Sequence, residues 1–282
     1  MINGIILQSS SLDNTIITVF LIALFIMIFY FGFRMFEMAY VIRNKKPLYN
    51  HVYFRLKRLN PNQQSILRNG FNFYNKLTKK QRRYFEHRVA CFIEDKTFIG
   101  RDRLAINDEI RVLISATAVM LTFGFRDYFI GLIDKIFVYP KPFYSKTNGD
   151  YHKGEFNPKL KSLVFSWEDF EQGYNIGDDN LNLGIHEFAH AIHLNSIKER
   201  DVSATIFKDA FRELTELLSN SKPMRDELIT SRYFREYAYT NQFEFLAVLV
   251  EYFFETPIEF KSQFPSIYNK VKQMLNFSYA KY

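Results

Sequence analysis

Apolar side chains form one unbroken run near the start of the chain. Residues 16–33 read IITVFLIALFIMIFYFGF and contain no charged side chain. As a helix, this run would measure about 27 Å at about 1.5 Å per residue, close to the hydrocarbon thickness of a bilayer. A buried core helix would be more amphipathic. A cleaved signal peptide would need a basic segment before the run and a small-residue cleavage site after it. The run therefore predicts a transmembrane helix, preceded by a short extracytoplasmic N-terminus at residues 1–15.

Positive charge lies on one side of this run. Asp13 is the only charged residue before it, whereas four Lys and Arg follow within residues 34–46. The positive-inside rule places such a flank in the cytoplasm. The single cysteine, Cys91, agrees with a reducing compartment, because it has no partner in the chain for a disulfide. We expect a single-pass protein of the inner (cytoplasmic) membrane whose catalytic domain faces the cytoplasm.

The basic character continues beyond the membrane flank. Residues 34–103 hold 17 Lys and Arg against 5 Asp and Glu, while the whole chain carries a net charge of +7. Such a block suits either nucleic acid or an anionic membrane surface. No helix-turn-helix, zinc-finger or RNP pattern accompanies it, so we expect no nucleic acid partner. We interpret residues 34–60 as a basic juxtamembrane segment and the lipid bilayer as the partner of the helix before it.

Helical periodicity dominates the rest of the chain. Helix-start signals stand at Asn60-Pro61, at Thr78 with Gln81, which form a capping box, and at Asn107. From residue 181 the pattern stays helical to the end, apart from interruptions at three prolines: Pro223, Pro257 and Pro265.

Strand patterns are few. Residues 135–139 (KIFVY) and 161–167 (KSLVFSW) read as strands, and the Gly-, Pro- and Asn-containing stretch 140–157 between them reads as a loop or hairpin. Residues 61–282 therefore predict one α+β domain, mostly helical with a small sheet.

The clearest chemical signal is the pattern His-Glu-x-x-His within residues 184–190 (GIHEFAH). Residues four apart share a helix face, so His186 and His190 can both reach one Zn²⁺ at about 2.0–2.1 Å. Glu187 is rotated by about 100° and lies beside the metal, where it can take a proton from an activated water. A surface helix with two histidines is the alternative. The apolar neighbours predict a core-facing helix instead, in which unpaired histidines are costly.

A catalytic zinc site needs three protein ligands and one open position. His193 is the only later histidine, and it either belongs to the site or packs in the core. A carboxylate on a later helix is the better donor. The apolar run at residues 241–255 carries Glu244 and Glu251, seven residues apart on one face, and buried carboxylates require partners. The residues alone leave both glutamates as candidates.

These segments together resemble a known family. The HEFAH segment follows a polar turn and a strand with Ser-Trp, and precedes the run EFLAVLVEYFFE. This arrangement is similar to the Mlc titration factor A family of zinc-dependent peptidases over roughly residues 77–257. Residues 237–247 (YAYTNQFEFLA) also resemble the catalytic domain of anthrax lethal factor. Both are gluzincins, which implies a zincin-like metallopeptidase domain.

The resemblance also implies roles for individual residues. His186, His190 and Glu244 would bind one zinc ion per chain. Glu187 would act as general base, and Tyr237 would assist catalysis by donating a hydrogen bond to the oxyanion. Glu251 either holds a zinc-bound histidine or is an ordinary helix carboxylate.

The function implied is a membrane-anchored zinc metallopeptidase that hydrolyses peptide bonds in the cytoplasm. We expect a peptide or protein substrate to lie extended along residues 161–167, interpreted as an edge strand. The alternative is a zinc-containing module that sequesters a transcriptional regulator, because the family is named for binding a repressor. The complete HExxH motif favours hydrolysis, since a purely structural zinc site has no use for Glu187.

Overall fold

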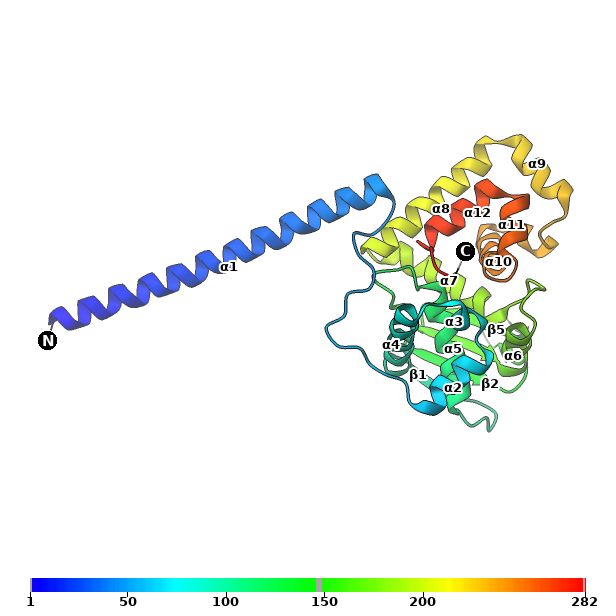
Figure 1. The fold of residues 1–282 in the computed structure, drawn as a ribbon, viewed down its shortest axis with the longest axis horizontal. Helices are drawn as coiled ribbons and strands as arrows, with labels where there is room; N and C mark the ends of the chain where they lie inside the picture. The colour runs from blue at the N-terminus through cyan, green and yellow to red at the C-terminus, as the bar shows by residue number, and fades with distance from the viewer. Residues whose placement is uncertain (1, 146–148, 281) are drawn as a thin grey trace. The chain divides into compact units, whose positions relative to one another are not determined.

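The computed structural model describes residues 2–145, 149–280 and 282, and the chain divides into two compact units, Met1–Leu48 and Tyr49–Tyr282 (Figure 1). The first unit is built on one helix, α1 (Ile2–Asn44). From Asn14 onward this helix is long and apolar enough to cross a membrane, as the sequence predicts. The boundary between the two units lies within residues 34–60, which the sequence predicts to be a basic juxtamembrane segment.

The second unit is mostly helical with a small sheet, which confirms the predicted fold class at this level. Its helices are α2 (Pro61–Gly70), α3 (Asn72–Lys76), α4 (Lys79–Asp95), α5 (Asp108–Leu121), α6 (Trp167–Asn175), α7 (Leu183–Lys198), α8 (Val202–Asn220), α9 (Lys222–Ser231), the 3₁₀ helix η1 (Glu236–Tyr239), α10 (Gln242–Glu255), α11 (Pro257–Gln263) and α12 (Pro265–Met274). Its strands are β1 (Thr97–Gly100), β2 (Lys135–Tyr139), β3 (Phe143–Ser145), β4 (Asp150–His152), β5 (Gly154–Asn157) and β6 (Ser162–Ser166).

The helix starts follow the capping signals of the sequence. Asn60 and Thr78 each form a complete capping box with the residue three positions on, and the Asn107 side chain accepts the Ile110 N–H at 2.9 Å. Each cap satisfies a backbone donor that the helix itself leaves unpaired. The prolines expected to interrupt the C-terminal helices stand in the first turns of α9, α11 and α12. There a missing N–H costs nothing.

The main sheet has the order β1-β2-β6-β5. Strand β6 pairs in parallel with β2 and antiparallel with β5, so both of its edges are used. The expectation that residues 161–167 form an edge strand is therefore wrong. Strands β1 and β5 are the two edges of this sheet, and β3 and β4 form a separate two-stranded sheet. Strand β1 and helix α6 have no counterpart in the sequence prediction.

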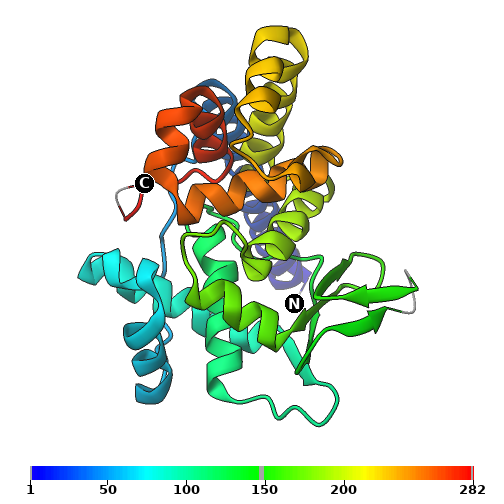
Figure 2. The same ribbon diagram turned by 90° about the vertical axis from the view of Figure 1, so that its right-hand side faces the viewer.

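Helix α7 lies at the centre of the second unit. It contacts α5, β5 and β6 on one side and α8 and α10 on the other. Figure 1 shows α8–α12 grouped on one side of α7 and α2–α5 with the strands on the other, and the turned view in Figure 2 shows the same division. Ile185, Phe188 and Ile192 of α7 are buried in the continuous apolar core. This burial explains why the HExxH helix is apolar on most of its surface.

A buried arginine fastens the start of the second unit to its core. Arg88 of α4 is fully buried and donates hydrogen bonds to the Asn50 carbonyl (3.2 Å) and the Tyr53 hydroxyl (2.5 Å). It also donates to carbonyl oxygens at the end of α5 and just beyond it, those of Thr122, Phe123 and Phe125. Its guanidinium lies 4.2 Å from the Tyr128 ring centroid. The charge is thus satisfied by oxygens and ring faces.

Candidate metal and active site

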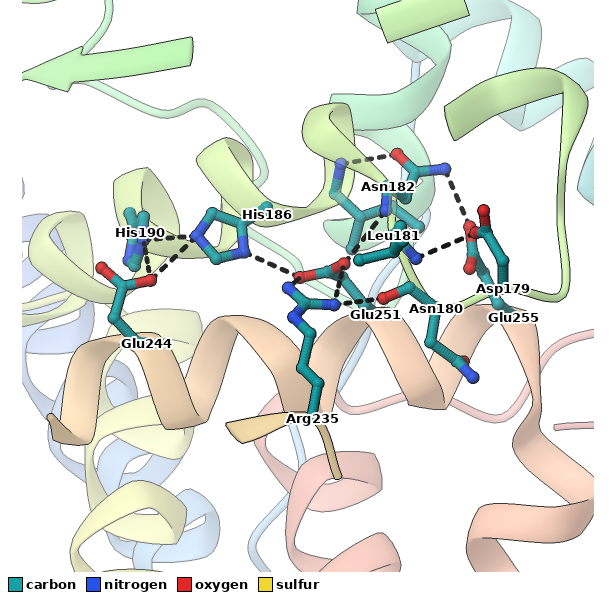
Figure 3. A network of polar contacts seen from close by, with 11 residues as sticks. Asp179, Asn180, Leu181, Asn182, His186, His190, Arg235, Glu244, Glu251 and Glu255 are labelled. Atoms are coloured by element: carbon teal, nitrogen blue, oxygen red, sulfur yellow. Dashed lines mark hydrogen bonds and ion pairs between the residues drawn. The ribbon is translucent and has the colours of Figure 1, made fainter. Parts of the chain in front are cut away.

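The two histidines of the HExxH motif face the same point. Helix α7 is capped by Asn182, whose side chain accepts the Ile185 N–H at 3.0 Å. One turn later His186 and His190 point to the same side, with their Nε2 atoms 3.1 Å apart (Figure 3). The four-residue spacing therefore places both imidazoles on one face, as the sequence predicts.

The third converging side chain comes from α10. Asn241 caps this helix by accepting the Phe243 and Glu244 N–H groups, so Glu244 lies in the first turn. Its Oε2 is 3.0 Å from Nε2 of His186 and 3.5 Å from Nε2 of His190. Among the described residues, these three side chains form a candidate metal cluster whose ligand atoms lie within 4.8 Å of one another. Of the two glutamates that the sequence leaves open, Glu244 is the one in this cluster.

The charges around these atoms suit a cation. Burial alone would lower the pKa of His186, but the Glu244 and Glu251 carboxylates raise it to about 9. Burial would likewise raise the pKa of Glu244, but the two histidines hold it well below its usual range. Positive charge is thus favoured where two imidazole nitrogens and one carboxylate oxygen meet. That donor set fits a transition-metal or zinc ion.

A buried ion pair contacts His186 at Nδ1, the ring nitrogen that faces away from Glu244. Oε1 of Glu251 lies 2.7 Å from Nδ1 of His186, and Glu251 is only 1% exposed. Arg235 donates to both oxygens of Glu251, at 2.7 and 3.0 Å, and the Asn182 N–H donates to Oε2 at 3.0 Å (Figure 3). The buried carboxylate thereby gains the partners that it requires. Sequence reasoning missed Arg235, which lies two residues before Tyr237.

Glu187 faces a cavity of about 610 Å³ that His186, Tyr237 and Gly154 also line. The Glu187 side chain is buried, and this burial raises its pKa, while the two histidines act in the opposite direction. The backbone of Gly154, the first residue of β5, packs directly against the Glu187 side chain. A Cβ at this position would lie 2.7 Å from Oε1 of Glu187. The glycine allows the edge strand to approach this carboxylate.

Tyr237 lies in η1 and lines the same cavity as His186 and Glu187. Its ring centroid is 6.0 Å from that of His186, and the side chain is half exposed. Burial of the hydroxyl and the nearby Glu244 carboxylate raise the pKa of Tyr237 to about 12. The phenol therefore keeps its proton at neutral pH and can donate it in a hydrogen bond.

His193 packs in the core. It is 3% exposed, and its ring lies 4.4 Å from Phe211 and 5.1 Å from Phe243, centroid to centroid. Burial, together with His190, lowers its pKa to about 4. The metal cluster formed by the described residues does not include it.

A helical domain that brings two HExxH histidines and a glutamate to one point is a metallopeptidase-like domain. The chain belongs to the family described as glucose-regulated metallo-peptidase M90, which matches residues 48–276. This confirms the resemblance found in the sequence. The match covers nearly all of the second compact unit and no residue of α1.

Three relatives are each 26% identical to the chain. An uncharacterized Synechocystis protein, slr2042, aligns over 237 residues, 76% of this chain and 83% of the relative. Mlc titration factor A of Pectobacterium atrosepticum aligns over 205 residues, 63% and 72% of the two chains. Mlc titration factor A of Yersinia pestis aligns over 195 residues, 64% and 72%.

Proposed function

We propose that this protein is a membrane-anchored zinc metallopeptidase of the gluzincin type, with a zincin-like domain on the cytoplasmic side of the inner membrane. The observation that carries the proposal is the convergence of His186, His190 and Glu244 beside a cavity that Glu187 faces. Membership of a metallo-peptidase family supports it. The apolar N-terminal helix and the basic residues after it support the anchoring and its orientation.

His186, His190 and Glu244 would hold the zinc ion. When bound, zinc supplies Lewis acidity toward the scissile carbonyl and lowers the pKa of water to about 7. Glu251 fixes the orientation of His186 through Nδ1 and leaves Nε2 free to ligate. Arg235 in turn keeps the Glu251 carboxylate in place.

Glu187 and Tyr237 would carry the proton and charge movements. Glu187 accepts a proton from the attacking water and passes it to the leaving amine. Its burial suits this task, because a raised pKa makes the carboxylate a stronger base. Tyr237 donates its phenolic hydrogen to the oxyanion that develops at the scissile carbonyl.

The substrate would bind along β5. This strand is at the edge of the sheet, and the chain leading into it, Tyr151 to Gly154, lines the cavity that Glu187 faces. An extended peptide can pair with a free strand edge through its main chain. Gly154 would place the scissile bond next to Glu187, since the two lie in contact.

The second candidate function is sequestration of a transcriptional regulator. The name Mlc titration factor A, borne by two of the relatives, favours such a partner. In that case zinc would serve structure alone, and Glu187 would have no chemical role.

Replacing Glu187 with Gln distinguishes the two functions. Glutamine keeps the size and hydrogen bonding of the side chain but cannot accept a proton from water. Peptide turnover by the full chain should fall about 10²–10⁴-fold, the usual contribution of a general base, with the zinc content unchanged. Glu227→Gln, on the exposed face of α9, is the matched control. Unchanged turnover in a zinc-loaded Glu187→Gln protein would overturn the peptidase mechanism and favour sequestration.

A further inference from the structure

A second cavity, of about 120 Å³, lies beside the N-terminus of α7. Aromatic rings of α3 and α10, and of the residue before α3, form much of its wall: Phe71, Phe73 and Phe254. None of the candidate metal ligands lines it, and neither does Glu187 or Tyr237. The peptidase chemistry proposed above therefore makes no use of this space.

Two buried polar atoms in this wall lack partners. Oε1 of Glu255 accepts a hydrogen bond from Nδ2 of Asn182 at 3.0 Å, but Oε2 is buried with no hydrogen-bond partner among the described residues. The Tyr174 hydroxyl is likewise buried and has no hydrogen-bond partner among the described residues. Native proteins leave few such atoms unsatisfied, and an ionised carboxylate is costly to bury without a cation.

The charges around Glu255 increase the need of its carboxylate for a nearby cation. Burial, with the negative charges of Asp179 and Glu251 nearby, raises the pKa of Glu255 to about 7, although the Asn182 side chain acts in the opposite direction. Among the residues that the structure describes, Lys76 is the one cation in the cavity wall; its side chain is exposed and lies 5.6 Å from the Tyr282 ring centroid. A positively charged ligand would supply the charge that the carboxylate lacks.

We propose that this cavity binds a small molecule with a primary ammonium group on an apolar body. The ammonium donates to Oε2 of Glu255, and the apolar body lies against the three phenylalanine rings. Ammonium groups also gain from aromatic faces. Either a simple amine or a free apolar amino acid has this chemistry. In the second case Lys76 would face the carboxylate of the ligand.

The site has a direct connection to the candidate metal ligands (Figure 3). The Asn182 side chain binds Glu255 and caps α7, while the Asn182 N–H donates to Glu251, which holds His186. A ligand that fixes Glu255 would therefore steady both the start of α7 and the partner of His186. We therefore expect the ammonium ligand and zinc to strengthen each other's binding by about 5-fold, and linkage requires the two effects to be equal.

Calorimetric titration of the full chain in detergent, loaded with zinc, tests the proposal with phenethylamine and L-phenylalanine as probes. Phenethylamine should bind the parent chain and the Glu259→Gln control, whose substituted residue is exposed on α11. Glu255→Gln should bind it about 10- to 100-fold more weakly, the range expected for a lost hydrogen bond between charged groups. If L-phenylalanine binds more tightly than phenethylamine, and Lys76→Ala removes this difference, the site is one for amino acids. If L-phenylalanine binds equally or more weakly, the site is one for simple amines.

A second comparison needs no variant. 2-Phenylethanol has the shape of phenethylamine without its charge, and it should bind at least about 10-fold more weakly. The proposal is overturned if neither amine binds, if the alcohol binds as well as the amine, or if a folded Glu255→Gln chain binds the amine as tightly as the parent.

Chelator competition should show tighter zinc binding with phenethylamine present, and an unchanged zinc affinity would overturn the linkage. The titration involves no peptide hydrolysis, so a Glu187→Gln chain should give the same heats whether or not the protein is a peptidase.

Discussion

Nδ1 of His186 lies 2.7 Å from Oε1 of Glu251, a residue seven positions after Glu244 on the same helix. Helix α10 thus contacts His186 twice, once on each ring nitrogen. The first contact places a carboxylate among the candidate ligands, and the second fixes the tautomer and the ring orientation. One helix therefore sets both the composition and the geometry of the site.

Replacing Glu251 with Gln should weaken zinc binding about 10- to 100-fold, the usual effect of losing the hydrogen-bond partner of a ligating histidine. The amide removes the charge that pairs with Arg235 and no longer favours the imidazole with hydrogen on Nδ1. Zinc affinity is measured by chelator competition on the folded full chain. Glu227→Gln, exposed on α9, should keep the parental affinity. Parental zinc affinity in Glu251→Gln would mean that His186 needs no support from α10.

Gly154→Ala should lower peptide turnover by about 10²-fold, because the new methyl group would displace the Glu187 carboxylate from its place and misalignment on that scale is costly. The zinc content should not change, since the three ligands lie elsewhere. Gly177→Ala is the matched control, as its added Cβ would meet no atom within 4 Å. Normal turnover in Gly154→Ala would show that β5 does not constrain Glu187.

Tyr237→Phe should keep zinc and lose about 10²-fold in kcat, the scale of one oxyanion hydrogen bond. Its KM should change little, because the interaction strengthens only as negative charge develops. Steady-state kinetics on a short peptide separates the two constants. Tyr144→Phe, on the exposed hairpin strand β3, serves as control. A rise in KM with constant kcat would instead assign Tyr237 to substrate binding.

Stability should fall as the pH drops below about 6.5, partly through His51. Burial, followed by the Arg88 charge, lowers the pKa of this histidine to about 3 from its ordinary value of 6.5. Between these values the unfolded chain binds the proton and the folded chain does not, so acid favours unfolding. From pH 6.5 to 5 the loss from this one group is about 2 kcal/mol.

His51→Gln removes this titration. The variant should be less stable than the parent at pH 7, because it loses the stacking of His51 on Tyr84. Its free energy of unfolding should nevertheless decline less steeply with acid. Denaturant titrations of both chains at several pH values provide the comparison. Identical slopes would mean that His51 does not contribute to the pH dependence.

The orientation in the membrane makes a separate prediction. A fluorescent protein that folds only in the cytoplasm, fused after Tyr282, should be bright. A phosphatase that is active only outside the cytoplasm should be inactive at the same position. The reason is the excess of Lys and Arg after the apolar run. The reverse pattern would place the domain outside and contradict the proposed localisation.

The sequence was informative where the physical cause is local. The caps at Asn60, Thr78 and Asn107 depend on side chains within three residues of the backbone groups that they satisfy, and each is present. The placement of His186 and His190 on one face of α7 depends only on helix periodicity. A family match could then be recognised from the motif and the composition of α10.

The sequence was uninformative where contacts are long-range. No local pattern shows that β5 rather than β6 occupies the sheet edge, because strand order is decided by pairing between separate segments. Glu251 lies in α10 and Arg235, 16 residues earlier, directly precedes η1, so their pairing depends on how α10 packs on η1. Gly154 gives no sequence signal either, since its importance comes from the nearness of Glu187.

The buried Arg88 also has a mechanical consequence. An arginine does not lose its proton, so if Asn50 and Tyr53 left it, the buried guanidinium would lose two of its five hydrogen bonds while keeping its charge. Tension applied along the chain from α1 would therefore stop at Asn50 and pass through Arg88 into α4, instead of unravelling the domain from its first residue.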